Sequence, residues 1–331
     1  MAATDITVLG FMSVTDMKEE VPLMRVFVTG ASGWIGSAVV PELIGAGHQV
    51  VGLARSEDSA AALAAAGAEV LRGNLDDLGI LAAAAADADG VIHLAFKHDI
   101  AFAGDFGAAI AADRRAVETF GAALAGSNRP FVLASGLAGL VPGRVATERD
   151  AHANDPAAES SGGPGGRHAT ADLTLSLAGR GVRSAVLRLP PTVYGAGDNG
   201  FVAALVGIAR AKGVSGYLGD GANRWPAVHR LDAAHLFRLA LEEAPAASVL
   251  HAVGDEGVPL RAIAEVVGRH LDVPVAPVPA ADAAEHFGWL GQVVALDSPA
   301  SSALTRDLMD WRPLRPGLLD DLEKGHYFQV G

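Results

Sequence analysis

The sequence contains no cysteine among its 331 residues, so it can form no disulfide, no thiolate nucleophile and no cysteine-based zinc site. Basic residues are also scarce: 25 Lys and Arg stand against 38 Asp and Glu, a net charge of −13, and they form no basic run. Contacts to nucleic-acid phosphates need a basic face, so no nucleic-acid partner is expected. The lack of cysteine leads us to expect a cytoplasmic location.

Long uninterrupted apolar runs are absent as well, although half of the residues are hydrophobic. The nearest approach to one, residues 79–96, is interrupted by Asp87, Asp89 and His93 and predicts a helix followed by a strand. Residues 1–23 have neither a basic start nor a continuous apolar core, so we expect a poorly ordered extension and not a secretory signal. No membrane partner is expected.

What the chain does contain is a glycine-rich turn after its first strand-like run, in the segment VFVTGASGWIGSAVV (26–40). In a dinucleotide-binding turn the first glycine permits a tight turn, the second lets the backbone approach a pyrophosphate, and the third lets the helix pack on the strand. The helix N-terminus then offers N–H groups to the phosphates. The cofactor contacts expected here are Thr29, Gly30, Ser32, Gly33, Trp34, Ile35 and Gly36.

Strand-like and helical patterns alternate over the following part of the chain. Strands are predicted at residues 48–54, 69–71, 90–96, 130–134 and 184–189, with helices such as 59–66 and 108–125 between them. This alternation implies right-handed crossovers, and therefore an α/β fold with a doubly wound parallel sheet. Residues 141–166, rich in Pro, Gly and Ser, predict a long loop, with a lid as one interpretation.

A last strand at residues 249–253 is expected to return the chain to the sheet, which makes the second domain discontinuous. We expect a dinucleotide-binding domain of residues 24–190 with 226–254. The smaller substrate-binding domain then comprises residues 191–225 with 255–331, and its clearest helical patterns are residues 260–271 and 317–323.

Arg55 and Ser56 follow the second predicted strand directly, at the position that faces the adenosine ribose. A carboxylate there would bind the 2′-hydroxyl, whereas Arg55 suits a 2′-phosphate, so NADP(H) is favoured over NAD. The alternative is a solvated surface arginine. The other expected cofactor contacts are Asn74 and Leu75 near the adenine, and Leu94, Ala95, Phe96, Pro190 and Tyr194 nearer the nicotinamide; packing explains Tyr194 equally well.

Taken in order, the segments TGASGWIG, GNLDD, VIHLAF, RLPPTVYG and VHRLDAAHL resemble the extended short-chain dehydrogenase/reductase family, also called NAD-dependent epimerases/dehydratases. The resemblance covers nearly the whole chain from Arg25 onward. It implies a Rossmann domain, a smaller C-terminal substrate domain over the nicotinamide, and a homodimer.

The sequence departs from this family at the catalytic residues. In the family a Ser or Thr polarises the substrate carbonyl, a Tyr transfers the proton, and a Lys four residues later lowers the pKa of the Tyr and holds the nicotinamide ribose. Ser135 or its neighbour Gly136 falls at the serine position, but the helix that should carry Tyr and Lys reads RHATAD (167–172). None of the three tyrosines has a lysine four residues later, so the chain resembles an atypical member that lacks the dyad.

Replacement proton donors are sought near the ends of the strands. Lys97 and His98 follow the fourth predicted strand at the level of the nicotinamide, and we expect them, with Ser135, to be catalytic; solvated loop charges are the alternative. His168 is a further candidate on the helix that normally carries the Tyr. His93 is expected to be a core residue, and His229 to be structural together with Asp232. The eleven histidines show no zinc-protease spacing, so no metal is predicted.

Three functions remain open from the sequence. The first is an NADP(H)-dependent reductase or dehydrogenase acting on a carbonyl or alcohol of a small, largely apolar molecule, with a non-standard or substrate-assisted proton donor. The second is a nucleotide-sugar epimerase or dehydratase, although losing the Tyr/Lys pair weighs against chemistry that needs a strong base. The third is a non-catalytic NADP(H)-binding sensor or regulator.

Overall fold

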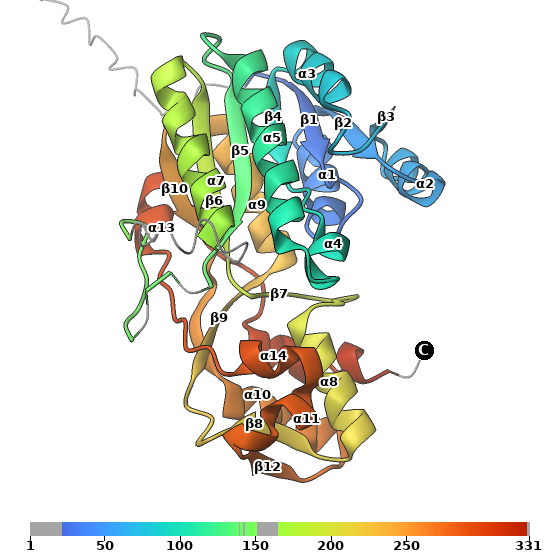
Figure 1. The fold of residues 1–331 in the computed structure, drawn as a ribbon, viewed down its shortest axis with the longest axis vertical. Coiled ribbons are helices and arrows are strands. Elements are labelled where there is room, and N and C mark those ends of the chain that lie inside the picture. Colours follow the sequence, from blue (N-terminus) through green and yellow to red (C-terminus); the bar gives the residue numbers. More distant parts are fainter. Residues whose placement is uncertain (1–21, 139, 142, 151–164, 330–331) are drawn as a thin grey trace, which may run out of the picture.

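A seven-stranded, fully parallel sheet organises the structure, a computed structural model that describes residues 22–138, 140–141, 143–150 and 165–329. The predicted N-terminal extension and most of the predicted loop at 141–166 lie outside these residues. The strand order is β10-β6-β5-β4-β1-β2-β3 (Figure 1). The strands are β1 (Arg25–Thr29), β2 (Gln49–Ala54), β3 (Glu69–Arg72), β4 (Gly90–His93), β5 (Pro130–Gly136), β6 (Arg183–Leu189) and β10 (Ser248–His251).

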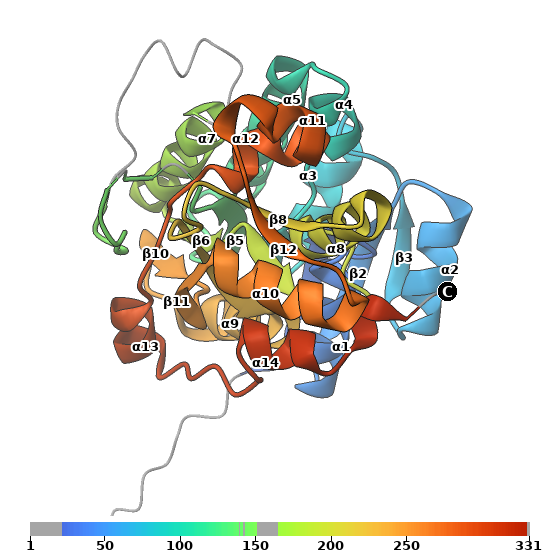
Figure 2. The same cartoon turned by 90° about the horizontal axis from the view of Figure 1, so that it is seen from below.

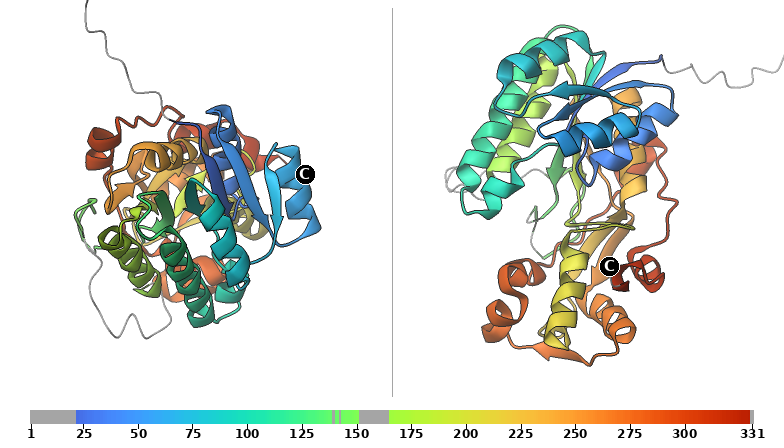
Figure 3. Two further views of the ribbon diagram at one scale, coloured as in Figure 1. Left: turned by 90° about the horizontal axis from the view of Figure 1, so that it is seen from above. Right: turned by 90° about the vertical axis from the view of Figure 1, so that its right-hand side faces the viewer.

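Helices cover both faces of this sheet (Figures 1 and 3). On one face α1 (Gly36–Gly45) packs beside α9 (Arg230–Glu243), where Leu43 and Phe237 are fully buried. The other face carries α3 (Leu78–Asp87), α5 (Phe106–Leu124) and α7 (Gly165–Ser176), with Leu81 and Phe120 in the core. Two shorter helices, α2 (Glu57–Ala65) and α4 (His98–Phe102), follow β2 and β4. The predicted doubly wound fold is confirmed.

A second, smaller unit lies beyond the carboxyl ends of the sheet strands (Figures 1 and 2). A three-stranded sheet, in the order β11-β9-β7, and a two-stranded sheet of β12 and β8 form its strands. Those strands are β7 (Thr192–Tyr194), β8 (Ser215–Leu218), β9 (Arg224–His229), β11 (Asp255–Pro259) and β12 (Val275–Val278). The helices are α8 (Phe201–Lys212), α10 (Leu260–Leu271), α11 (Ala283–Phe287), α12 (Gly291–Val294) and α14 (Leu318–Glu323), with short turns of 3₁₀ helix at Ala280–Asp282, Gly288–Leu290 and His326–Phe328. A further 3₁₀ turn, Leu177–Arg180, follows α7 in the large unit.

One C-terminal segment, which contains α13 (Ala303–Met309), was expected in the smaller unit but packs on the large sheet. Helix α13 packs beside β10, and Met309 and Trp311 belong to the hydrophobic core beneath α1 and α9. The Trp311 indole donates a hydrogen bond to the carbonyl of Asp232 (3.1 Å). The chain therefore returns to the large sheet once more before α14. The sequence did not indicate this return, because α13 is short and its apolar residues are weakly periodic.

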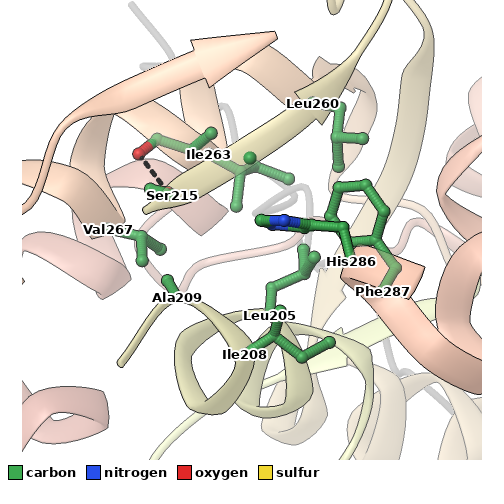
Figure 4. A pocket seen from close by; sticks show the side chains of 11 residues that line it. Leu205, Ile208, Ala209, Ser215, Leu260, Ile263, Val267, His286 and Phe287 are labelled. Carbon is green, nitrogen blue, oxygen red and sulfur yellow. Dashed lines mark hydrogen bonds between the residues drawn. The ribbon is translucent and has the colours of Figure 1, made fainter. Parts of the chain in front are cut away.

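The core of the second unit contains a small cavity between α8, β8, α10 and α11 (Figure 4). Its lining includes Leu205, Ile263, Phe287 and the imidazole of His286. The volume of about 10 Å³ has room for roughly one water molecule, so a substrate does not fit there. Among the helices that the structure describes, none is both long and apolar enough to cross a membrane.

Candidate functional site at the carboxyl edge of the sheet

The glycine turn between β1 and α1 has the geometry that a dinucleotide-binding turn requires. Gly30 has φ +66°, and a Cβ added to it would lie 2.7 Å from the Ala95 nitrogen, so the end of β4 approaches the turn closely. A Cβ on Gly36 would lie 2.2 Å from the Gly30 carbonyl oxygen. Gly33 has more room, with its nearest neighbour at 3.2 Å, and its N–H donates to the Gly30 carbonyl (3.0 Å). Two of the three glycines are therefore fixed by the fold alone, whereas Gly33 is not.

The start of α1 presents backbone N–H groups at this turn. Within the described chain, the N–H groups of Trp34 and Ile35 have no backbone acceptor, as is usual at a helix N-terminus and favourable for binding phosphate. The indole of Trp34 donates to the Val193 carbonyl (2.8 Å), and the Arg230 guanidinium lies 4.3 Å from its ring centroid. The Trp34 side chain thus links the turn to β7, which leaves its backbone for the predicted cofactor contact.

Basic side chains gather where β2 and β3 end, at the predicted ribose position. Arg55 is largely exposed, with 69% of its side-chain surface accessible, and donates to the Asp99 carboxylate (2.9 Å). The hydroxyl of Ser56 caps α2 by accepting the Ser59 N–H (3.2 Å). Arg72, at the end of β3, donates to the Ser56 carbonyl (2.7 Å) and pairs with Glu57. Sequence reasoning missed Arg72. The signal that could have found it is that β3 pairs with β2 and ends in a basic residue, next to the end of β2 that precedes Arg55.

The predicted adenine loop is held by its own side chains. Asp77 accepts from both the backbone N–H and the side-chain amide of Asn74 (2.8 Å each), and Leu75 is buried in the core. Lys97 reaches this loop and donates to Asp76 (2.5 Å), which lowers the pKa of that carboxyl. The amide of Asn74 and the amine of Lys97 are therefore engaged within the protein, and their roles toward cofactor and substrate stay predictions.

Ser135 lies near the carboxyl end of β5, the strand next to β4. Its side chain is buried, with 4% of the residue exposed, and the described chain offers its Oγ no hydrogen-bond partner. A buried hydroxyl without a partner costs free energy, which a bound ligand would recover. Ser135 is thus placed where the sequence expected it, at the edge of the sheet where α/β proteins bind their ligands.

Arg167, on the first turn of α7, places its guanidinium at the carbonyl of the residue before this serine, and sequence reasoning did not single it out. Its Nη2 donates to the carbonyl of Ala134 (3.1 Å), and its guanidinium carbon lies 4.3 Å from the ring centroid of Phe96. Burial lowers the pKa of this guanidinium, and the negative charge of Asp113 opposes that effect. In the described part of the chain, no carboxylate forms an ion pair with it. The sequence showed only that this position lacks a Tyr or Lys.

The two histidines proposed as donors are held in their neutral form at pH 7. His98 packs edge-on against Phe96, with 5.1 Å between centroids, and burial together with the charge of Arg167 lowers its pKa. For His168, burial with the charges of Arg188 and Arg167 lowers the pKa to about 4. A neutral imidazole is a weak acid, so neither ring is well suited to give a proton at neutral pH.

The remaining candidates have structural contacts. His93 is a buried core residue, as expected, with Nδ1 2.5 Å from the Thr29 hydroxyl and Nε2 3.2 Å from Asp113. His229 accepts the Leu231 N–H and caps α9, and Asp232 accepts the N–H groups of Leu314 and Arg315, which confirms their structural roles.

Tyr194 is buried, and its hydroxyl donates to the Pro316 carbonyl (2.7 Å). Burial and the nearby Asp255 raise its pKa, and this shift, with the hydroxyl already bound to Pro316, weighs against Tyr194 as a substitute for the missing catalytic tyrosine. Tyr327 donates to Asp198 (2.9 Å), and burial likewise raises its pKa. The contact of Tyr194 with the cofactor stays a prediction, as does that of Pro190, which is buried after β6. No cluster of three or more His, Asp or Glu side chains suited to a metal ion occurs in the residues that the structure describes.

Comparisons with known proteins place this geometry in a family. The "Uncharacterized protein C2A9.02" of Schizosaccharomyces pombe is 46% identical over 306 residues, which cover 92% of this chain and all of the relative. The 4-hydroxy-2-methyl-3-oxo-4-farnesyl-3,4-dihydroquinoline-1-oxide ketoreductase of Stigmatella aurantiaca is 28% identical over 285 residues, 84% of each chain.

The same fold occurs in a solved structure of DesIV, a dTDP-glucose 4,6-dehydratase from Streptomyces venezuelae with NAD and TYD bound. It superposes with a TM-score of 0.72 at 20% identity, covering 92% of this chain and 96% of that one. The model of the NAD dependent epimerase/dehydratase family matches residues 26–251, more than half of the chain. The protein therefore belongs to the NAD-dependent epimerase/dehydratase family.

Proposed function

We propose that the protein is an NADP(H)-dependent ketoreductase or dehydrogenase that acts on a carbonyl or alcohol of a small, largely apolar molecule. The observation that carries the proposal is the buried hydroxyl of Ser135, which has no partner among the described residues and lies at the same sheet edge as the glycine turn. A hydroxyl in that position is suited to polarise a carbonyl, and a nicotinamide cofactor held by the turn would supply the hydride. The ketoreductase relative supports this class of reaction.

The preference for NADP(H) rests on the basic groups beside α2. Arg55 is exposed at the end of β2, and Arg72 reaches the Ser56 carbonyl at the start of that helix. Two guanidinium groups near the predicted ribose favour a 2′-phosphate. Asp99, which pairs with Arg55, would release it when the phosphate binds.

The proton donor is non-standard in this proposal. The lowered pKa values of His98 and His168 weigh against imidazolium donors, and Lys97 is bound to Asp76. Water, Lys97 or an acidic hydroxyl of the substrate beside the carbonyl then remain as sources of the proton. The protein would contribute mainly hydride delivery and orientation of the carbonyl.

The test is NADPH oxidation, followed by absorbance, with a panel of aromatic and aliphatic ketones. We expect reduction of part of the panel, and a loss of about 10- to 100-fold in kcat/KM for Ser135→Ala. Ser184 is the matched control, because its hydroxyl is also buried without a partner in the described chain but lies at the amino end of the neighbouring strand β6. Ser184→Ala should keep the wild-type rate.

Two outcomes contradict the reductase, and a third contradicts the role of Ser135 in it. Tight NADPH binding without reduction of any ketone would favour the sensor or regulator. Interconversion of a nucleotide sugar without net NADPH oxidation would favour the epimerase or dehydratase. Equal rates for the Ser135→Ala and Ser184→Ala variants would remove Ser135 from the mechanism.

A further inference from the structure

The guanidinium of Arg167 is a cation at the carboxyl edge of the sheet, where the site is proposed, and the proposed function gives it no role. We propose that Arg167 binds an anionic oxygen of the substrate, either a carboxylate or an ionised hydroxyl, next to the reacting carbonyl. This inference rests on the proposed function because it concerns the same site, and it specifies the class of substrate more narrowly.

The position of Arg167 follows from its two anchors. Its Nη2 donates to the carbonyl of Ala134, the residue before Ser135, and one face of the guanidinium lies on the ring of Phe96. These contacts come from β5 and from the segment after β4, and β4 lies between β5 and β1, the strand that leads into the glycine turn. A substrate whose carbonyl reaches the Ser135 hydroxyl would therefore have its adjacent substituent near Arg167.

The hydrogen bonds of Arg167 are incomplete by comparison with other arginines packed against the sheet. A guanidinium carries five N–H donors, and the described residues supply Arg167 with one acceptor. Arg129 donates to the carbonyls of Ala85, Ala86, Ala88 and Ala123, and Arg183 donates to those of Leu241 and Ala244. Among the described residues, Arg167 therefore has N–H donors without an acceptor, on a guanidinium that contacts Ala134 near the carboxyl end of β5.

The electrostatic surroundings also favour an anion. Arg167 is half-buried, which leaves part of it accessible, and this burial lowers the pKa of its guanidinium, so the surroundings penalise its charge. Three titratable groups interact electrostatically with Arg167: Asp113 on α5, His98 on α4, and His168, the next residue on α7. Both histidines have lowered pKa values. Only Asp113 is an anion among these three, and it lies 3.2 Å from the imidazole of His93. An anionic ligand would supply the paired counter-charge that no described carboxylate provides.

The role proposed for Arg167 differs from that of the missing tyrosine, which transfers a proton in the family. A guanidinium keeps its proton at any physiological pH, so Arg167 binds and orients and does not act as the general acid. Its planar fork matches a carboxylate in a bidentate pair and an ionised hydroxyl in a single charge-assisted hydrogen bond. A ketone with such a group beside the carbonyl is expected to bind better than a plain ketone of the same size.

The experiment measures binding to the complex with NADP⁺, in which no hydride can be transferred. Calorimetry would compare benzoylformate with its methyl ester, and 2-hydroxy-5-nitroacetophenone with its methyl ether, so that each pair differs by one negative charge. The first pair tests a carboxylate and the second an ionised hydroxyl. Wild-type protein should bind the anion of at least one pair about 10-fold or more tightly than its methylated partner.

Arg167→Met should weaken binding of that anion by about 10- to 100-fold while changing the methylated partner by less than about threefold. Arg167→Lys keeps the charge without the fork and should recover part of the affinity. Arg183→Met is the control, since it also removes an arginine bound to carbonyls, but at the amino end of β6. It should leave both affinities unchanged.

The results separate this inference from the proposed function. If the wild type reduces neutral ketones but prefers neither anion, the inference is overturned and the reductase stands. An anion preference that disappears in Arg167→Met, in a protein that reduces no ketone, supports the anion site and contradicts the reductase. Arg167→Met protein that binds NADP⁺ normally and keeps the full preference also overturns the inference.

Discussion

At the scale of single residues, Arg55 provides a direct test of cofactor choice. Its exposed guanidinium is paired with Asp99, an exposed carboxylate, so the pair contributes little and opens easily. Arg55→Asp would place a negative charge where the 2′-phosphate is expected. We predict that NADPH affinity falls by about 10- to 100-fold and that NADH affinity changes little, as measured by fluorescence titration.

Two variants frame this prediction. Asp99→Asn removes the competing carboxylate and should leave NADPH affinity unchanged or raise it. Arg114→Asp reverses the charge of an exposed arginine on α5 that pairs with Glu118, and it serves as the control for net charge. Equal losses for NADPH and NADH in Arg55→Asp would contradict the assignment of NADP(H).

Individual residues also show where the sequence suffices and where it does not. Arg55 and Ser135 could be placed because each directly follows or ends a strand whose pattern is plain, and strand ends define the site in a parallel sheet. Arg72 and Arg167 could not, because their roles depend on which neighbouring strand or ring each side chain reaches. Arg167 contacts Ala134 and Phe96, which lie more than thirty residues away in sequence.

At the scale of elements, the turn between β1 and α1 separates a structural glycine from a functional one. A methyl group on Gly36 would lie 2.2 Å from a backbone oxygen, so Gly36→Ala should destabilise the protein by about 1–3 kcal/mol through overpacking. Gly33→Ala meets its nearest atom at 3.2 Å and should change stability by less than about 1 kcal/mol.

For dinucleotide binding, in contrast to stability, we expect Gly33→Ala to have a large effect. Its Cβ would occupy the surface that the pyrophosphate approaches, so Gly33→Ala should weaken dinucleotide binding by about tenfold or more while the protein stays folded. Urea unfolding and a cofactor titration on the two variants measure both effects. Dinucleotide affinity at the wild-type level in Gly33→Ala would place the phosphates elsewhere.

Elements with strong patterns were predictable, and those defined by tertiary contacts were not. The amphipathic pattern at residues 260–271 gives α10 with the same bounds, because Ile263 and Val267 fall on one buried face. Helix α13 has only seven residues, and its place beside β10 is fixed by Met309 and Trp311 entering a core built from distant segments. Local periodicity carries no information about such a partner.

At the scale of the whole molecule, a buried polar cluster beside β10 joins the sheet to the C-terminal segment. Arg188 of β6 donates to the carbonyl of Asp150 (2.9 Å) and to Nε2 of His251 (3.3 Å). The other ring nitrogen of His251 lies 2.9 Å from the Ser301 carbonyl. These contacts assign the proton to Nδ1 and leave Nε2 as the acceptor, so the fold holds this imidazole neutral.

Acid should therefore weaken the whole fold before most carboxylates titrate. Burial lowers the pKa of His251 to about 4 from its usual 6.5, so between these values the unfolded chain binds more protons than the folded one. Stability then rises with pH across this window: it is complete above pH 6.5 and is lost as the pH falls toward 4. At pH 5.5 the loss from this one imidazole amounts to about 1 kcal/mol.

The measurement is the free energy of unfolding in urea at pH 7.5 and pH 5.5. Wild-type protein should lose stability between the two values, and His168, with a pKa lowered to about 4 by burial, adds a similar amount. His251→Gln removes one titrating group. The free energy of unfolding of this variant should therefore differ between the two pH values by about 1 kcal/mol less than that of the wild type, with the same slope against urea concentration. Because Gln leaves a polar group facing Arg188, the variant should fold, although it is less stable than the wild type at pH 7.5. A pH dependence identical to that of the wild type would show that His251 is not held neutral by the cluster, and that another group sets the acid sensitivity of the fold.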